Sequence, residues 1–129
     1  MKYISVALLL LVVVACSAKL SEEEYYKNAQ ENYTGKKFDL AIENFKGIVE
    51  NYPEGKHNAE AMFMLGFINA NDIADLEEAK KYYTMFIEKY PEHDLADDAQ
   101  YELDNLGKDI NDLPIFKDTA DSTEESPAI

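Results

Sequence analysis

The side chains best suited to metal chemistry in this sequence are two histidines, His57 and His93. Each lies in a predicted loop shortly after a Pro-Glu pair, so a shared metal ion would require two separate loops to meet. Imidazole is the commonest protein ligand for transition metals, but two histidines on different loops do not make a site. We therefore expect each histidine to be a solvated loop residue or a helix cap, and we predict no metal site.

A second candidate is the loop that carries Asn69, Asn71, Asp72 and Asp75. Its side-chain oxygens are of the kind that calcium prefers, but the spacing and the central glycine of an EF-hand loop are missing. We expect these residues to cap helices. The chain also has no serine in a nucleophile-elbow setting and no glycine-rich phosphate loop, so we predict no catalytic residue, no cofactor and no small-molecule substrate. The protein is not expected to be an enzyme.

The composition narrows the possible partners further. The chain has 129 residues, with 12 Lys+Arg against 26 Asp+Glu and a net charge of −14. All the cations are lysines, so the phosphates of a nucleic acid would be repelled and no arginine could read a base. We predict that the protein does not bind nucleic acid. With 5 Gly and 4 Pro, the chain has few turn residues, which favours a small helical domain. Its one Cys cannot form a disulfide within the chain.

The N-terminal residues have the features of an export signal. Lys2 gives a positive start, and residues 4–14 form an apolar run that is interrupted only by Ser5. This run is too short to cross a bilayer, which takes about 20 residues, but it has the length of the apolar part of a signal peptide.

The apolar run ends in Val13, Val14, Ala15 and Cys16, which resembles the lipobox of bacterial lipoproteins. The resemblance implies cleavage between Ala15 and Cys16 and a lipid on the Cys16 thiol, which would anchor the chain through its acyl chains. The alternative is a plain signal peptide or a short anchor, with Cys16 as a small apolar residue. By resemblance to Gram-negative sorting, serine rather than aspartate after Cys16 favours the outer membrane.

The rest of the chain repeats with an offset of 38 residues. Residues 41–68 align with 79–106, and the Tyr-Pro-Glu sequence at 52–54 recurs at 90–92. Apolar spacing and capping signals predict helices over 22–34, 37–51 and 57–70, a fourth that follows Asp75 and ends near 89, and a fifth over 95–111. Ser21 with Glu24, and Asp75 with Glu78, have the spacing of capping boxes, and Asp94 is the expected cap of the fifth helix. We also expect an ion pair between Glu77 and Lys81.

This pattern resembles the tetratricopeptide repeat (TPR) family, in which paired helices cross at small residues and each repeat ends in proline. The resemblance covers residues 22–111, and the Tyr-Pro-Glu endings are similar to those of BamD-type outer-membrane assembly lipoproteins and of the periplasmic TPR protein associated with Tol–Pal. It implies an all-α solenoid of about five antiparallel helices, two repeats and a capping helix. The domain limits are then 1–15 for the signal, 16–21 for a lipidated tether, 22–111 for the helices and 112–129 for an acidic, disordered tail. The resemblance places Ala29 opposite Ala41, and Gly66 opposite Ala79, where the helices of each repeat cross. The corresponding packing positions are Ala29, Ala41, Phe45 and Pro53 in the first repeat, and Gly66, Ala79, Tyr83 and Pro91 in the second.

The same resemblance implies a concave face lined by the first helix of each repeat. An aromatic residue recurs there at equivalent positions of three helices, which predicts a groove for a peptide or a helix. The alternative is that these aromatics belong to the core, with Tyr25 as the core member beside Tyr26. Gly47, in mid-helix, costs about 1 kcal/mol relative to alanine, which a close neighbour would justify. The candidate face comprises Tyr26, Gln30, Phe63, Phe67, Tyr101 and Asn105.

These observations favour a lipid-anchored protein–protein interaction module of the bacterial cell envelope, most readily at the outer membrane and facing the periplasm. Its expected partners are an envelope protein and, through Cys16, the membrane. The pathway implied by the resemblance is outer-membrane protein assembly or envelope and cell-division coordination. The alternative is a scaffold whose repeats associate with one another and serve no dedicated client.

Overall fold

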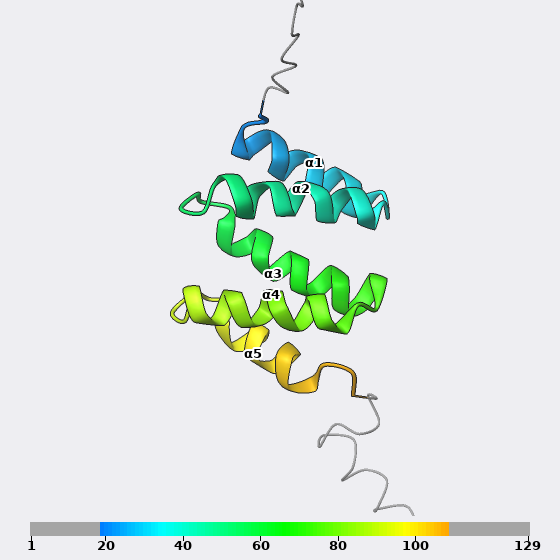
Figure 1. Ribbon diagram of the computed structural model, residues 1–129, viewed down its shortest axis with the longest axis vertical. Coiled ribbons are helices and arrows are strands. Elements are labelled where there is room, and N and C mark those ends of the chain that lie inside the picture. Colours follow the sequence, from blue (N-terminus) through cyan, green and yellow to red (C-terminus); the bar gives the residue numbers. More distant parts are fainter. Residues whose placement is uncertain (1–18, 109–129) are drawn as a thin grey trace, which may run out of the picture.

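The computed structural model describes residues 19–108, and this part of the chain is built of helices and contains no strand (Figure 1). The all-helical fold predicted from the repeat is confirmed. The elements are α1 (Glu22–Thr34), α2 (Phe38–Asn51), α3 (Asn58–Ile68), the π-helix η1 (Asn69–Ile73), α4 (Leu76–Lys89) and α5 (Ala96–Asn105).

The first helix begins and ends where the sequence predicts. The Glu24 amide donates to the Ser21 Oγ at 3.3 Å, and the Ser21 amide donates back to the Glu24 carboxylate at 2.8 Å. This confirmed capping box satisfies donors that a helix start leaves without partners. The bonds from Ser21 also lower the pKa of Glu24.

The third helix differs from its predicted range of 57–70. Its α-helical part ends at Ile68, and the chain continues as η1 before Ala74 turns it with a φ of 62°. The second repeat has one residue more than the first at this point, and the wider π-turn takes it up. The buried Asn69 side chain donates to the Leu65 carbonyl at 2.7 Å, which supplies a partner for that carbonyl.

The start of α4 is only half of the predicted capping box. Asp75 accepts a hydrogen bond from the Glu78 amide at 3.1 Å. The Glu78 carboxylate does not return the bond, because it accepts from Lys81 at 3.0 Å. The predicted pair between Glu77 and Lys81 is therefore wrong, and the lysine pairs with Glu78, one residue closer in the sequence.

The fifth helix is shorter than the predicted 95–111, and no side chain caps its start. His93 Nδ1, rather than Asp94, accepts from the Leu95 amide at 3.1 Å. The helix ends at Asn105, and Gly107 has a φ of 76°, a conformation that glycine adopts without strain. The prediction of Asp94 as the cap is wrong because the helix begins one residue later, which makes Leu95 the N-cap residue.

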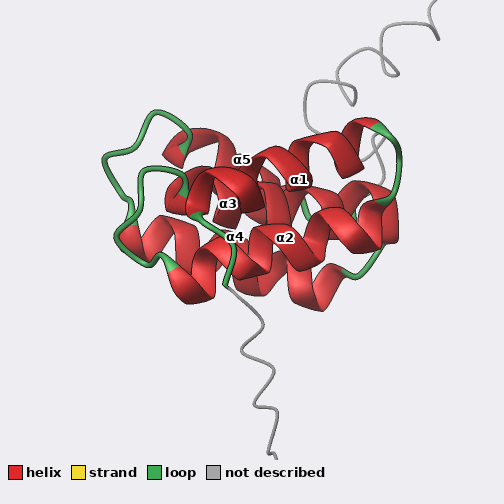
Figure 2. Cartoon of the chain, turned by 90° about the horizontal axis from the view of Figure 1, so that it is seen from above, coloured by secondary structure: helices red, strands yellow, loops and turns green. Residues whose placement is uncertain are grey.

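The helices stack in two layers. Seen along the stack, α1, α3 and α5 form one layer and α2 and α4 the other (Figure 2). Two clusters of buried side chains lie between the layers, one around Phe45 and Leu65 and the other around Tyr83 and Phe86. The predicted packing residues Ala29, Ala41, Phe45, Ala79 and Tyr83 are fully buried, Gly66 is buried, and Pro53 and Pro91 lie exposed after the second helix of each repeat.

Glycines mark the closest helix approaches. A Cβ on Gly47 of α2 would lie 2.7 Å from Tyr25 Cδ1 of α1. Tyr25 is therefore the close neighbour that justifies a glycine in the middle of this helix. A Cβ on Gly66 of α3 would lie 2.7 Å from Tyr83 Cδ1 of α4. The sequence interpretation placed Ala79 opposite Gly66, but the nearest atoms belong to the Tyr83 ring.

The Tyr-Pro-Glu sequences close the same end of each repeat. Tyr52 Oη donates to the Leu20 carbonyl at 2.8 Å, and Tyr90 Oη donates to Asn58 Oδ1 at 2.7 Å. Each tyrosine lies 32 residues after its acceptor, so each ties the end of a second helix to the start of the first helix in the same repeat. The tyrosine of each Tyr-Pro-Glu sequence therefore has the same structural role in both repeats.

Candidate protein-binding face

The six residues predicted to form a binding face all lie on α1, α3 and α5, the helices of one layer (Figure 2). Their surroundings differ from helix to helix. On α1 they form a polar cluster with α3, on α3 one of the two, Phe63, packs against the core, and on α5 they border an open hollow.

On α1, Tyr26 lies between two neighbours from the second repeat. Its ring stacks on His57 with centroids 3.8 Å apart and planes 12° apart, and its hydroxyl donates to Glu60 Oε1 at 2.7 Å. Gln30 donates to the same oxygen at 3.4 Å. Burial and the Glu60 carboxylate together raise the pKa of the Tyr26 phenol. This cluster holds α1 against α3.

His57 is the N-cap residue of α3, which agrees with the expectation of a helix cap, although its side chain makes no capping hydrogen bond. Its side chain is only 16% exposed, so the alternative expectation of a solvated histidine is wrong here. Its backbone amide donates to Glu22 Oε1 at 2.7 Å. Glu23 lies beside the ring and pairs with Lys56, and these two neighbours, Lys56 foremost, lower the pKa of Glu23.

On α3, Phe63 packs edge-to-face against two aromatic rings of α4. Its centroid lies 5.8 Å from that of Tyr83 and 5.9 Å from that of Phe86. The ring is half-buried and packs against the second core cluster. Phe67, one turn further along α3, is also half-buried.

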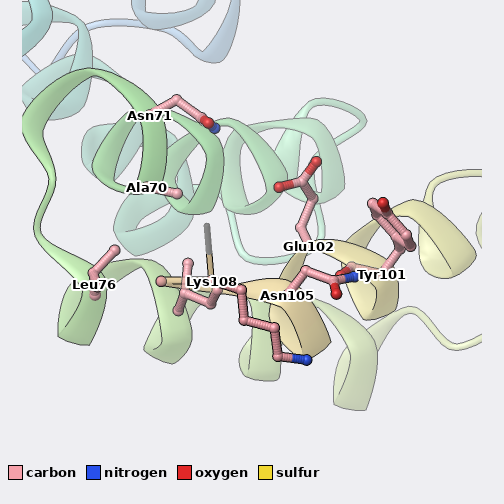
Figure 3. Close-up of a pocket in the computed structure, with 9 residues that line it drawn as sticks. Ala70, Asn71, Leu76, Tyr101, Glu102, Asn105 and Lys108 are labelled. Carbon is pink, nitrogen blue, oxygen red and sulfur yellow. The ribbon is translucent and has the colours of Figure 1, made fainter. Parts of the chain in front are cut away.

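On α5, Tyr101 is the most exposed of the six, with 54% of its surface accessible. Together with Asn105 it borders a hollow of about 450 Å³ between η1 and α5 (Figure 3). Asn105 donates to the Tyr101 carbonyl at 2.8 Å. This part of the face is thus the part most open to a ligand.

Sequence reasoning missed Glu60, which accepts from two of the six residues. A detectable signal was its position one turn before Phe63, because residues three apart share a helix face. The repeat pattern gives Tyr26 and Phe63 equivalent positions, so the sequence could not show that their side chains have different neighbours.

The remaining candidate sites lie partly outside the described residues. Ala15, Cys16 and the whole predicted tail, 112–129, are not among residues 19–108. Within that range no three His, Cys, Asp or Glu side chains gather as a metal site would need. None of the helices described there is long and apolar enough to cross a membrane.

The comparison with known families decides the relationship. The sequence profile of a family described as YfiO, outer membrane lipoprotein, matches residues 18–122. The chain belongs to the YfiO family. It is thus an envelope lipoprotein of the TPR type, as the Tyr-Pro-Glu repeats predict. The match spans every helix from α1 to α5, so YfiO membership and the two-layer stack describe the same region. No solved structure matches the chain.

Proposed function

We propose that this protein is a lipid-anchored adaptor that binds another protein of the bacterial envelope, in outer-membrane protein assembly or in envelope and cell-division coordination. The observation that carries the proposal is the YfiO family match over residues 18–122, which includes the whole helical stack. Cys16 would hold the lipid, after cleavage at Ala15.

The layer of α1, α3 and α5 is the surface we propose for the partner. It offers Tyr101 and Asn105 beside a hollow, with Phe67 and Gln30 on the neighbouring helices. Aromatic residues at such positions supply much of the energy of protein interfaces. Tyr26 and Phe63 hold the helices of this face in position. Tyr26 does so through its hydrogen bond to Glu60, and Phe63 through its packing on the core.

Charge favours a basic partner. The segment from Glu92 to Asp104 contains six acidic residues and no lysine. A partner segment with apolar anchors and flanking Lys or Arg would be attracted to this surface, while anionic lipids and nucleic acids would be repelled.

In-cell photocrosslinking tests the face. A benzoylphenylalanine at Tyr101 is expected to capture an envelope protein, which mass spectrometry identifies. The matched control is Glu43, an exposed residue on α2 in the opposite layer. Capture from position 43 but not from 101 would move the binding surface to the other layer. Position 63 is a poorer probe, because the Phe63 ring packs on α4.

The alternative, a self-associating scaffold, predicts a different behaviour in solution. An adaptor should elute as a monomer in size exclusion at all concentrations until its partner is added. Growth of the particle with protein concentration alone would favour the scaffold.

The anchor is tested separately. Cys16→Ala is expected to move the protein from the membrane to the soluble fraction, or to leave the signal uncut, because no thiol remains to carry the lipid. The readouts are fractionation and uptake of a labelled fatty acid by the unaltered protein. A wild-type chain that takes up no label would contradict the lipid anchor.

A further inference from the structure

The place where the first helix of a repeat turns into the second, here called the corner, carries two aromatic rings in the first repeat and none in the second. In the first repeat, Tyr33 at the end of α1 and Phe38 at the start of α2 lie with ring centroids 6.0 Å apart. The equivalent positions of the second repeat hold Ala70 and Leu76. Two aromatic rings are thus replaced by a methyl group and a leucine, which is 41% exposed.

The hollow between η1 and α5 lies where these rings are missing. Ala70 and Leu76 line it on one side, and Tyr101, Asn105 and Leu106 line it from α5 (Figure 3). Its volume of about 450 Å³ is within the range of ligand pockets, roughly 300–1,000 Å³. The hollow is therefore large enough for an aromatic side chain and its neighbours.

The chain itself leaves the described structure at this hollow. Lys108, the last described residue, is part of its lining. The next residues include an apolar group in an otherwise acidic stretch, and Phe116 is eight residues beyond Lys108. Eight residues reach at most about 26–29 Å, so Phe116 is within reach of a hollow that Lys108 borders. The apolar group consists of Ile110, Leu113, Ile115 and Phe116.

We propose that residues 110–116 fold back into this hollow and that Phe116 fills the corner that Tyr33 and Phe38 fill in the first repeat. The tether raises the local concentration of the segment to the millimolar range, so it occupies the hollow ahead of a second copy. Asp112 is the one acidic residue inside this segment, and the acidic residues of α5 repel those from Asp118 onward, which limits docking to residues 110–116 and leaves 117–129 as the predicted free tail.

Photocrosslinking of the full chain in cells tests the proposal. A benzoylphenylalanine at Phe116 is expected to link within the same molecule, to residues 70–76 or 101–108, and the product should migrate as a monomer. A link between two chains would assign the hollow to a second copy, and a link to another protein would assign it to a client. Each of these two outcomes would overturn the proposal. A link elsewhere in the chain, or no link at all, would overturn it as well.

Two variants serve as controls. Ala70→Phe restores a ring at the position of Tyr33 and is expected to reduce the link from position 116 at least fivefold. Leu113→Ser combined with Ile115→Ser changes no residue of the five-helix stack and is expected to reduce it similarly. An unchanged yield in the double variant would contradict docking whether or not Ala70→Phe folds. The same crosslinker at Ser122 should give no link to the hollow.

Discussion

The two repeats bring their helices together at a glycine, but they place that glycine on opposite partners. In the first repeat the glycine, Gly47, is on the second helix and Tyr25 on the first covers it. In the second repeat Gly66 is on the first helix and Tyr83 on the second covers it. The backbones follow one pattern (Figure 1), while the pairing of large and small side chains is reversed.

The reversal changes how each crossing tolerates substitution. Tyr25 is half-buried at the edge of the stack, so its ring has room to turn toward solvent. Tyr83 is fully buried and enclosed by the second core cluster. Tertiary surroundings, rather than the repeat pattern, therefore decide which crossing is rigid.

The largest effect is expected from Phe63→Ala. The ring packs on Tyr83 and Phe86, so its loss should lower the free energy of unfolding by about 3 kcal/mol, at the low end for Phe→Ala because the ring is half-buried. The equivalent change on α5, Tyr101→Ala, should cost less than about 0.5 kcal/mol, as is usual for exposed sites. Circular dichroism melts measure both. Equal losses would mean that Tyr101 is as much a core residue as Phe63.

Alanine at the two glycines tests the reversal directly. Gly66→Ala drives a Cβ into the enclosed Tyr83 ring, and overpacking costs about 1–3 kcal/mol. The gain of about 1 kcal/mol in helix propensity offsets part of it, so we expect a net loss of up to about 2 kcal/mol. Gly47→Ala should be nearly neutral, because Tyr25 can move aside. Urea titrations of both variants give the comparison, and a larger loss at Gly47 would show that Tyr25 is the more tightly held ring.

The sequence predicted features that depend on local signals. The capping box at Ser21, the range of α1 and the end of each repeat at Tyr-Pro-Glu follow from residues close together in the chain. The family relationship followed from the 38-residue repeat and from the Tyr-Pro-Glu sequence that ends each repeat.

Features set by contacts between distant residues were predicted poorly. The stacking of His57 on Tyr26 joins residues of different repeats, and no local pattern indicates it. The same holds for the Tyr83 ring over Gly66, which took the place expected for Ala79. The predicted fifth helix ran to residue 111, but α5 ends at Asn105, just before Gly107 with its positive φ.

A smaller effect is expected at the hydroxyl of Tyr83, which the first repeat lacks because Phe45 occupies the equivalent position. The Tyr83 hydroxyl is buried without a hydrogen-bond partner among the described residues. Tyr83→Phe removes this unpaired group and should stabilise the protein by about 1 kcal/mol. Thermal melts at neutral pH measure it. A loss of stability would indicate that the hydroxyl has a partner.

The same hydroxyl gives a pH dependence. Burial raises the pKa of Tyr83 above its ordinary value of 10.0, so the unfolded chain ionises first. The free energy of unfolding should be independent of this group below about pH 10 and should fall as the pH rises above it. In Tyr83→Phe the fall above pH 10 should be less steep, although Tyr26 and Tyr82, whose pKa values burial also raises, still contribute. Identical slopes would contradict the role of Tyr83.

The smallest difference is expected between the two tyrosines that close the repeats. Tyr90→Phe removes a hydrogen bond to Asn58, which is fully buried, so its oxygen keeps only the distant Lys89 ammonium at 3.4 Å. We expect a loss of about 1 kcal/mol, a typical value for one hydrogen bond. Tyr52→Phe releases the Leu20 carbonyl, which is half-buried at the edge of the stack and accessible to water, so its loss should be about half as large. Urea titrations at neutral pH resolve the two values. A greater loss for Tyr52→Phe would show that the first repeat, next to the tether, depends more strongly on its closing tyrosine than the second.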